Sequence, residues 1–93
     1  MRLKSFEIDA ILKAVHHRDP RAMIYLFGSR VDDQKKGGDI DLLILSQTLM
    51  PSDKRAIRGE LWQSIGEQKI DLVIAHDTSE PFVRIALETG VRL

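Results

Sequence analysis

Three aspartates stand at the starts of two apolar segments, and their spacing suits metal binding. Asp39 and Asp41 open the segment D-I-D-L-L-I-L, and Asp71 has the second position of I-D-L-V-I-A. Residues two apart on a strand share a face, so the first two carboxylates should project together. Carboxylates gathered in one place repel one another, and a bound cation relieves that repulsion. Because the pattern contains no histidine or thiol, the expected ion is Mg²⁺ or Mn²⁺.

A second short motif suits the binding of phosphate groups. Gly28 lets the backbone approach a ligand closely, Ser29 adds a hydroxyl donor, and Arg30 could supply charge-assisted hydrogen bonds. The sequence has no G-x-x-x-x-G-K-[ST] motif, so a P-loop is excluded. Together with the aspartates, this motif predicts a site for a nucleoside triphosphate.

The strands that must position these residues are short and apolar. Residues 22–27, 39–45 and 70–75 have the composition of buried strands, and the polar residues 29–38 form a loop with room for a helical turn. A helix between the second and third strands implies that these two strands are parallel. Parallel strands begin at the same edge of a sheet, so Asp71 should lie near the other two aspartates. If the first strand is antiparallel to the second, Gly28 and Ser29 reach that edge too.

Three further segments have helical patterns. The first helix carries apolar residues at i, i+3, i+4 and i+7 and ends before residues 19–20, since the residue before a proline disfavours the α conformation (Ile8, Ile11, Leu12, Val15). The second helix begins at 51–53 and ends at Gly66, and the third spans 81–87 and closes at Gly90. We expect Phe82 and Ile85 to form the core-facing side of this last helix.

Composition indicates one small domain, residues 1–93, with no bias toward a charged partner. Fourteen basic residues balance fourteen acidic ones, so direct nucleic-acid binding is not expected. There is no cysteine, which excludes disulfides and thiolate chemistry. The first residues are charged and no apolar stretch approaches the length of a membrane span. We therefore expect a cytoplasmic protein with no membrane association.

The combination of F-G-S-R, D-I-D-L-L-I and K-I-D-L-V-I resembles the signature of the DNA-polymerase-β-like nucleotidyltransferases. More narrowly, the chain resembles the minimal single-domain nucleotidyltransferases that pair with HEPN proteins as toxin-antitoxin systems. The resemblance implies an α/β fold with a small, mixed, three- to four-stranded sheet flanked by helices. It also implies that Asp39, Asp41 and Asp71 hold two Mg²⁺ ions and that Gly28, Ser29 and Arg30 contact ATP.

The same resemblance implies a reaction and a partner. One or a few AMP units would pass from ATP to a hydroxyl, expected to be a tyrosine hydroxyl, of an all-helical HEPN ribonuclease toxin. The chain would then act as an antitoxin and assemble with itself or with that toxin.

Other interpretations of these residues stay open. The loop after Arg30 is shorter and more charged than is usual in the family, and this favours a binding-only antitoxin that masks the toxin without catalysis. A small-molecule nucleotidyltransferase of the aminoglycoside type is a third alternative, although such enzymes use a second domain for the acceptor. Asp71 could instead be a solvated edge residue, Arg30 a surface charge, and Trp62 a core or interface residue.

Overall fold

The computed structural model describes residues 1–93 and contains three helices, four strands and two 3-10 turns. In chain order they are α1 (Ser5–His16), β1 (Met23–Phe27), a 3-10 turn (Gly28–Val31), β2 (Ile40–Leu45), a 3-10 turn (Pro51–Asp53), α2 (Lys54–Ile65), β3 (Ile70–Ala75), α3 (Pro81–Thr89) and β4 (Val91–Arg92). The predicted helices and the three predicted strands are confirmed, with boundaries that shift by a few residues at most. None of the three helices has the length and apolar character needed to cross a bilayer.

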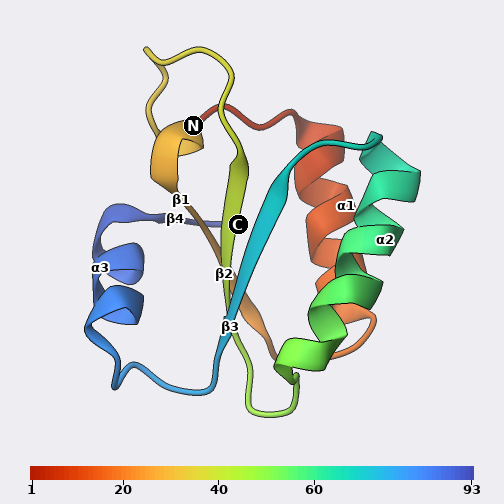
Figure 1. Ribbon diagram of the computed structural model, residues 1–93, viewed down its shortest axis with the longest axis vertical. Coiled ribbons are helices and arrows are strands. Elements are labelled where there is room, and N and C mark those ends of the chain that lie inside the picture. Colours follow the sequence, from red (N-terminus) through yellow and green to blue (C-terminus); the bar gives the residue numbers. More distant parts are fainter.

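The four strands form one mixed sheet in the order β3-β2-β1-β4 (Figure 1). β2 and β3 are parallel, as the helix between them predicts, and β1 is antiparallel to both β2 and β4. This sheet confirms the fold class expected from the sequence. The strand β4 was not predicted, because its two residues, Val91 and Arg92, are too few to carry an alternating pattern.

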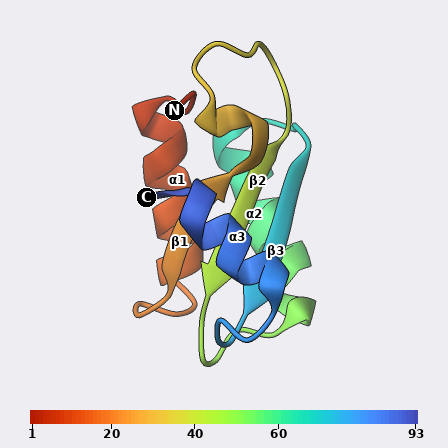
Figure 2. The same ribbon diagram turned by 90° about the vertical axis from the view of Figure 1, so that its left-hand side faces the viewer.

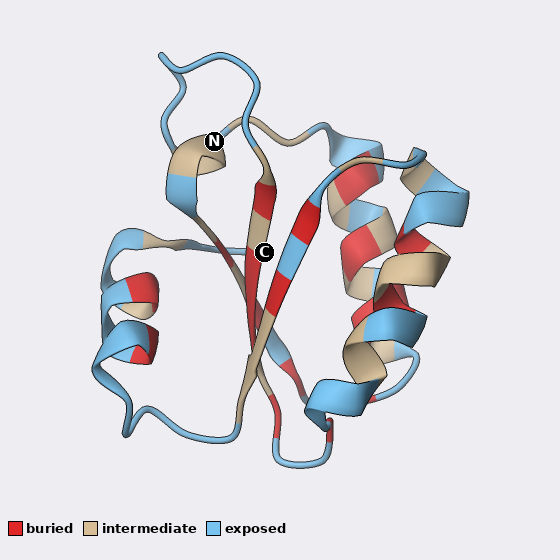
Figure 3. Cartoon of the chain, in the orientation of Figure 1, coloured by how far each residue is buried: buried red, intermediate tan, exposed pale blue.

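Helices cover both faces of the sheet, but unequally. α1 and α2 lie side by side on one face, whereas α3 alone lies against the other (Figures 1 and 2). The larger core lies under α1 and α2, where the fully buried side chains include Ile11, Val15, Ile24, Leu26, Ile40, Leu42, Ile44, Ile57 and Leu61 (Figure 3). Burying one such side chain contributes about 1.5–3 kcal/mol, so this face supplies most of the apolar stabilisation.

The smaller core on the opposite face corrects one expectation about α3. Leu43 of β2 packs there with Val83 and Ala86, whereas Phe82 and Ile85 are 48% and 58% exposed. The helix therefore turns a narrow stripe of smaller residues toward the sheet. Phe82 flanks that stripe and Ile85 lies well away from it, because successive helical residues are offset by about 100°. The sequence contains two apolar stripes on this helix and does not show which one faces the sheet.

A polar network connects two turns at the end of the sheet remote from the aspartate rim. The buried Asp19, in the turn after α1, accepts a hydrogen bond of 2.5 Å from the hydroxyl of Ser46, which follows β2. Asp19 also accepts from the Arg21 amide at 3.0 Å, and the Ser46 oxygen accepts from the Leu49 amide at 2.9 Å. The hydrogen bond from Ser46 lowers the pKa of the Asp19 carboxyl, and the Arg21 amide acts in the same direction.

Replacing Asp19 with alanine should therefore destabilise the fold in a pH-dependent way. We expect Asp19→Ala to cost about 2 kcal/mol near neutral pH, the usual worth of a hydrogen bond to a charged group. Because the folded-state pKa is lowered, the contribution is fully present above the ordinary value of 3.8 and is lost as pH falls through the folded value. Urea denaturation of both proteins across this range measures the difference.

The exposed Asp9 of α1 provides the control, since Asp9→Ala removes the same charge without this network. A cost for Asp19→Ala that matches the cost for Asp9→Ala at every pH would contradict the stabilising role of the Asp19 network.

Candidate active site

Two of the predicted carboxylates stand directly opposite each other. In the parallel pairing of β2 with β3, Asp41 is in register with Asp71, and in the antiparallel pairing of β1 with β2, Phe27 is in register with Asp41. Residues opposite each other on neighbouring strands project from the same face of a sheet. Phe27, Asp41 and Asp71 therefore form a row across three strands, on the face that α3 partly covers.

The electrostatic state of Asp41 reflects this crowding. Burial raises the pKa of its carboxyl, and the negative charges of Asp71 and then Asp39 raise it further. Lys69 acts in the opposite direction with a smaller effect. Two facing carboxylates, one of them half-buried, are a donor set that a divalent cation would stabilise.

Asp39 lies at the same rim but has a different partner. It precedes β2, and its carboxylate is 3.4 Å from the ammonium group of Lys69, the residue before β3. As the side chains stand, no three or more His, Cys, Asp or Glu residues are grouped in a way that could hold a metal ion. The structure therefore brings Asp41 and Asp71 into contact, while Asp39 is ion-paired beside them.

Gly28 places the end of β1 against this carboxylate pair. Its φ of +77° lies in the left-handed region that favours glycine. A Cβ atom at this position would overlap the Oδ2 atom of Asp41, so the backbone itself forms one wall of the site. The predicted close approach at Gly28 thus exists, and the 3-10 turn begins at this residue.

Ser29 and Arg30 serve the loop in ways that their sequence motif did not predict. Three nitrogen atoms of the Arg30 guanidinium donate hydrogen bonds to protein oxygens: to Gly38 at 3.2 Å, to Arg2 at 3.0 Å and to the Gln68 side chain at 3.4 Å. The Ser29 side chain packs against Gly38, where a Cβ atom would overlap its hydroxyl. The Arg30 side chain therefore ties the loop to the N-terminal segment and to the turn before β3, and its hydrogen bonds do not go to the carboxylates.

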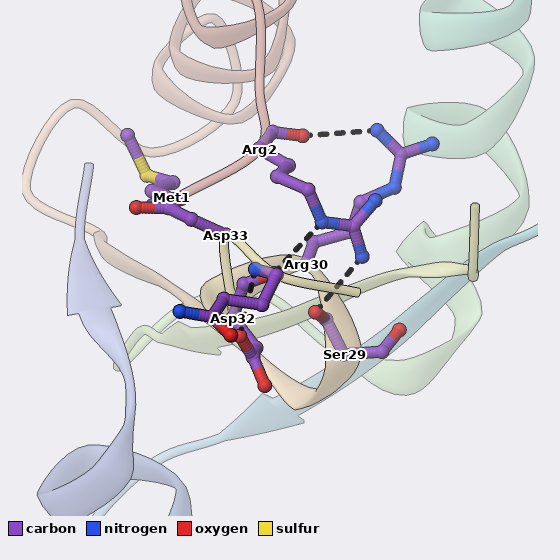
Figure 4. Close-up of polar contacts among 7 residues, drawn as sticks. Met1, Arg2, Ser29, Arg30, Asp32 and Asp33 are labelled. Atoms are coloured by element: carbon purple, nitrogen blue, oxygen red, sulfur yellow. Dashed lines mark hydrogen bonds and ion pairs between the residues drawn. The ribbon is translucent and has the colours of Figure 1, made fainter. Parts of the chain in front are cut away.

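Arg2 is a residue of this region that sequence reasoning missed. Its side chain donates to the carbonyl oxygens of Asp32 at 2.8 Å and Ser29 at 3.0 Å, and its amide donates to the Arg30 carbonyl at 2.7 Å (Figure 4). The Met1 amino group pairs with Asp33 nearby. No local pattern marks Arg2, because its partners lie far along the chain and are mostly backbone carbonyls.

The site is an open rim. The surface has four clefts, and neither Gly28 nor any of the three aspartates lines one of them. One cleft, of about 570 Å³, lies between the start of α1 and the end of α2 and includes Arg2 and Arg30. The carboxylate pair is consequently open to a large ligand, but the chain has no enclosed pocket beside it.

Comparison with known proteins agrees with the fold. The sequence model described as "Polymerase beta, Nucleotidyltransferase" matches residues 9–93. The chain therefore belongs to the polymerase beta nucleotidyltransferase family and has the activity class of a nucleotidyltransferase. No curated protein matches the sequence. Arg2 lies outside the region that the family model matches.

The close contact at Gly28 predicts a selective loss of activity. Gly28→Ala forces a side chain into the space of the Asp41 carboxylate and should lower nucleotidyl transfer about 100-fold, the usual effect of displacing a catalytic group by about 1 Å. Gly66→Ala is a matched control, because Gly66 also has a positive φ, +86°, but no atom stands near its added Cβ. Each variant places a side chain in a backbone conformation that favours glycine, which should cost about 1–3 kcal/mol of stability.

The test compares the nucleotidyl-transfer rates of the two folded variants at saturating ATP. Equal transfer rates for Gly28→Ala and Gly66→Ala would show that the close approach of Gly28 to Asp41 does not contribute to nucleotidyl transfer.

The hydrogen bonds of Arg2 predict a local effect on the loop. Arg2→Ala removes both side-chain bonds to the loop, so the Asp32 amide, which donates to the Ser29 carbonyl at 3.2 Å, should exchange its hydrogen about tenfold faster. Arg55→Ala, an exposed arginine on α2, should leave this exchange unchanged. Amide hydrogen exchange followed by NMR provides the measurement, and equal protection in both variants would refute the bracing role.

Proposed function

We propose that the chain is a Mg²⁺-dependent adenylyltransferase that acts as an antitoxin. It transfers one or a few AMP units from ATP to a hydroxyl, expected to be that of a tyrosine, on a cognate all-helical toxin of the HEPN type. The observation that carries the proposal is the in-register pairing of Asp41 with Asp71 beside the backbone of Gly28. The resemblance of the F-G-S-R and D-I-D-L-L-I motifs to the minimal nucleotidyltransferases supplies the choice of partner.

The donor set fits a hard divalent cation. Asp41 and Asp71 supply oxygen ligands, and Asp39 can join them if its ion pair with Lys69 opens. Bound Mg²⁺ would neutralise the crowded carboxylates and polarise the phosphates. Burial and the neighbouring carboxylates raise the pKa of Asp41, and a bound cation would offset both effects, which supports this assignment.

The residues of the chain have distinct tasks in the proposed reaction. Gly28 and Ser29 bind the triphosphate through the closely approaching backbone and the hydroxyl group. The acceptor oxygen forms a bond to the α-phosphorus, the bond between the α-phosphorus and the bridging oxygen breaks, and pyrophosphate leaves. Asp71, which is exposed whereas Asp41 is half-buried, receives the proton of the acceptor hydroxyl at its carboxylate.

The open rim supports an acceptor that belongs to another macromolecule. No cleft adjoins the carboxylates, so the chain offers little to enclose a small acceptor such as an aminoglycoside. A protein partner can bring its own surface and exclude water from the rim on binding. This absence of an acceptor pocket is what favours a protein hydroxyl over a small molecule.

A binding-only antitoxin is the second candidate, and three observations favour it. Asp39 is paired with Lys69, the Arg30 side chain is hydrogen-bonded to other parts of the protein, and no three carboxylates form a ready metal site. A chain with this arrangement could neutralise a toxin by covering its surface alone.

The proposal is tested by incubating the purified chain with Mg²⁺, ATP and the protein encoded by the adjacent open reading frame. Intact-mass analysis then shows whether that protein has gained adenylate. Wild type should add one or more adenylates to the partner. Asp41→Asn should lower the rate by about 10³-fold or more, because the substitution removes a metal ligand at nearly constant shape. Asp9→Asn on the exposed face of α1 should behave like wild type.

Co-expression separates the two candidates. If the chain is an enzyme, Asp41→Asn should fail to protect cells from the toxin. Full protection by Asp41→Asn, with no mass added to the partner by wild type, would replace the enzymatic proposal with the binding-only antitoxin.

A further inference from the structure

An aromatic pair continues the row of catalytic side chains toward α3. Phe27 stands opposite Asp41 in the sheet, one strand further from Asp71, and directly precedes Gly28. The ring of Phe82, from the first turn of α3, meets the Phe27 ring edge to face, with centroids 5.6 Å apart and planes at 81°. Phe82 thus contacts the residue that stands next to Asp41 in the row of Phe27, Asp41 and Asp71.

About half of the Phe82 side chain is accessible to solvent in this position. It is 48% exposed, although its neighbour Phe27 is half-buried, and Val83 and Ala86 already supply the contact of α3 with the sheet. The exposed part of the ring is free to contact a ligand, and covering it would remove apolar area from water. Its place beside the carboxylates indicates that a ligand of the same site covers it.

The chemistry of the expected substrate identifies that ligand. In the proposed reaction the phosphates of a nucleoside triphosphate lie at Gly28 and the carboxylate pair, and a ribose separates the α-phosphate from the base. The aromatic pair lies about one strand spacing from Asp41, at roughly 5 Å between neighbouring Cβ atoms, with Phe82 one ring further along. The base can therefore reach Phe82 while the phosphates remain at the rim.

We infer that Phe82, held in place by Phe27, is the stacking platform for the base of the nucleoside triphosphate. The inference rests on the proposed nucleotidyl transfer and adds the place where the base binds. Every base presents a flat π-face, so a platform of this kind stabilises binding with little discrimination among bases. Selection of one nucleotide would then require contacts from the partner.

Isothermal titration in the presence of Mg²⁺ tests the platform with two ligands, ATP and inorganic tripolyphosphate. Phe82→Ala should weaken ATP binding about tenfold and leave tripolyphosphate binding unchanged, because only ATP has a base to stack. Phe82→Tyr should restore ATP binding, and Phe82→Leu should not. Ile85→Ala is the matched control, since Ile85 is an exposed apolar residue on the same helix and should bind both ligands like wild type.

The outcomes separate this inference from the function on which it rests. Wild type that binds ATP no tighter than tripolyphosphate, or Phe82→Ala that binds ATP like wild type, overturns the platform and leaves the proposed transfer intact. Wild type that binds neither ligand overturns both. Normal ATP binding with lost transfer to the partner protein would instead assign Phe82 to the docking of the acceptor, and the platform would again be wrong.

Discussion

The in-register parallel pairing of β2 with β3 is the constraint on which the rest of the site depends. It places Asp41 opposite Asp71 at the start of both strands, and α2, which connects the strands, covers the apolar face behind them. Burial of the Asp41 carboxylate and the like charge of Asp71 beside it oppose folding, and both raise the pKa of Asp41. The fold tolerates that cost because the other residues of β2 are apolar, and Ile40, Leu42 and Ile44 are fully buried on the opposite face.

The second requirement is a backbone that can approach the carboxylates. At Gly28 the chain leaves β1 in a conformation that a side chain would strain, with no room for a Cβ atom beside Asp41. The Arg2 side chain donates hydrogen bonds to carbonyl oxygens of the loop that follows. The Arg30 side chain of that loop donates to the Gly38 and Arg2 carbonyls in return. Hydrogen bonds to backbone carbonyls thus supply the order that the polar sequence of this loop lacks.

The strands could be predicted from short apolar runs, and the helices from their apolar periodicity and their start and stop signals. All of these patterns are local in the sequence. The helix between the second and third strands predicted that these strands are parallel, and hence that Asp41 and Asp71 would lie at one edge of the sheet. The network of Arg2 could not be predicted, because its partners are carbonyl oxygens distant in sequence. The pairing of Asp39 with Lys69, and the choice of Val83 over Phe82 for the core, depend on three-dimensional packing that no periodicity expresses.

The alternation along β3 has a further consequence for how errors in folding are rejected. A shift of one residue between β2 and β3 would turn Asp71 toward the face that α2 covers and would expose Leu72 in its place. A carboxylate buried there without a partner would cost several kcal/mol, so a misaligned sheet is unstable as well as inactive. Burial of the apolar face therefore selects the register between β2 and β3. A chain that folds has Asp41 and Asp71 correctly opposed.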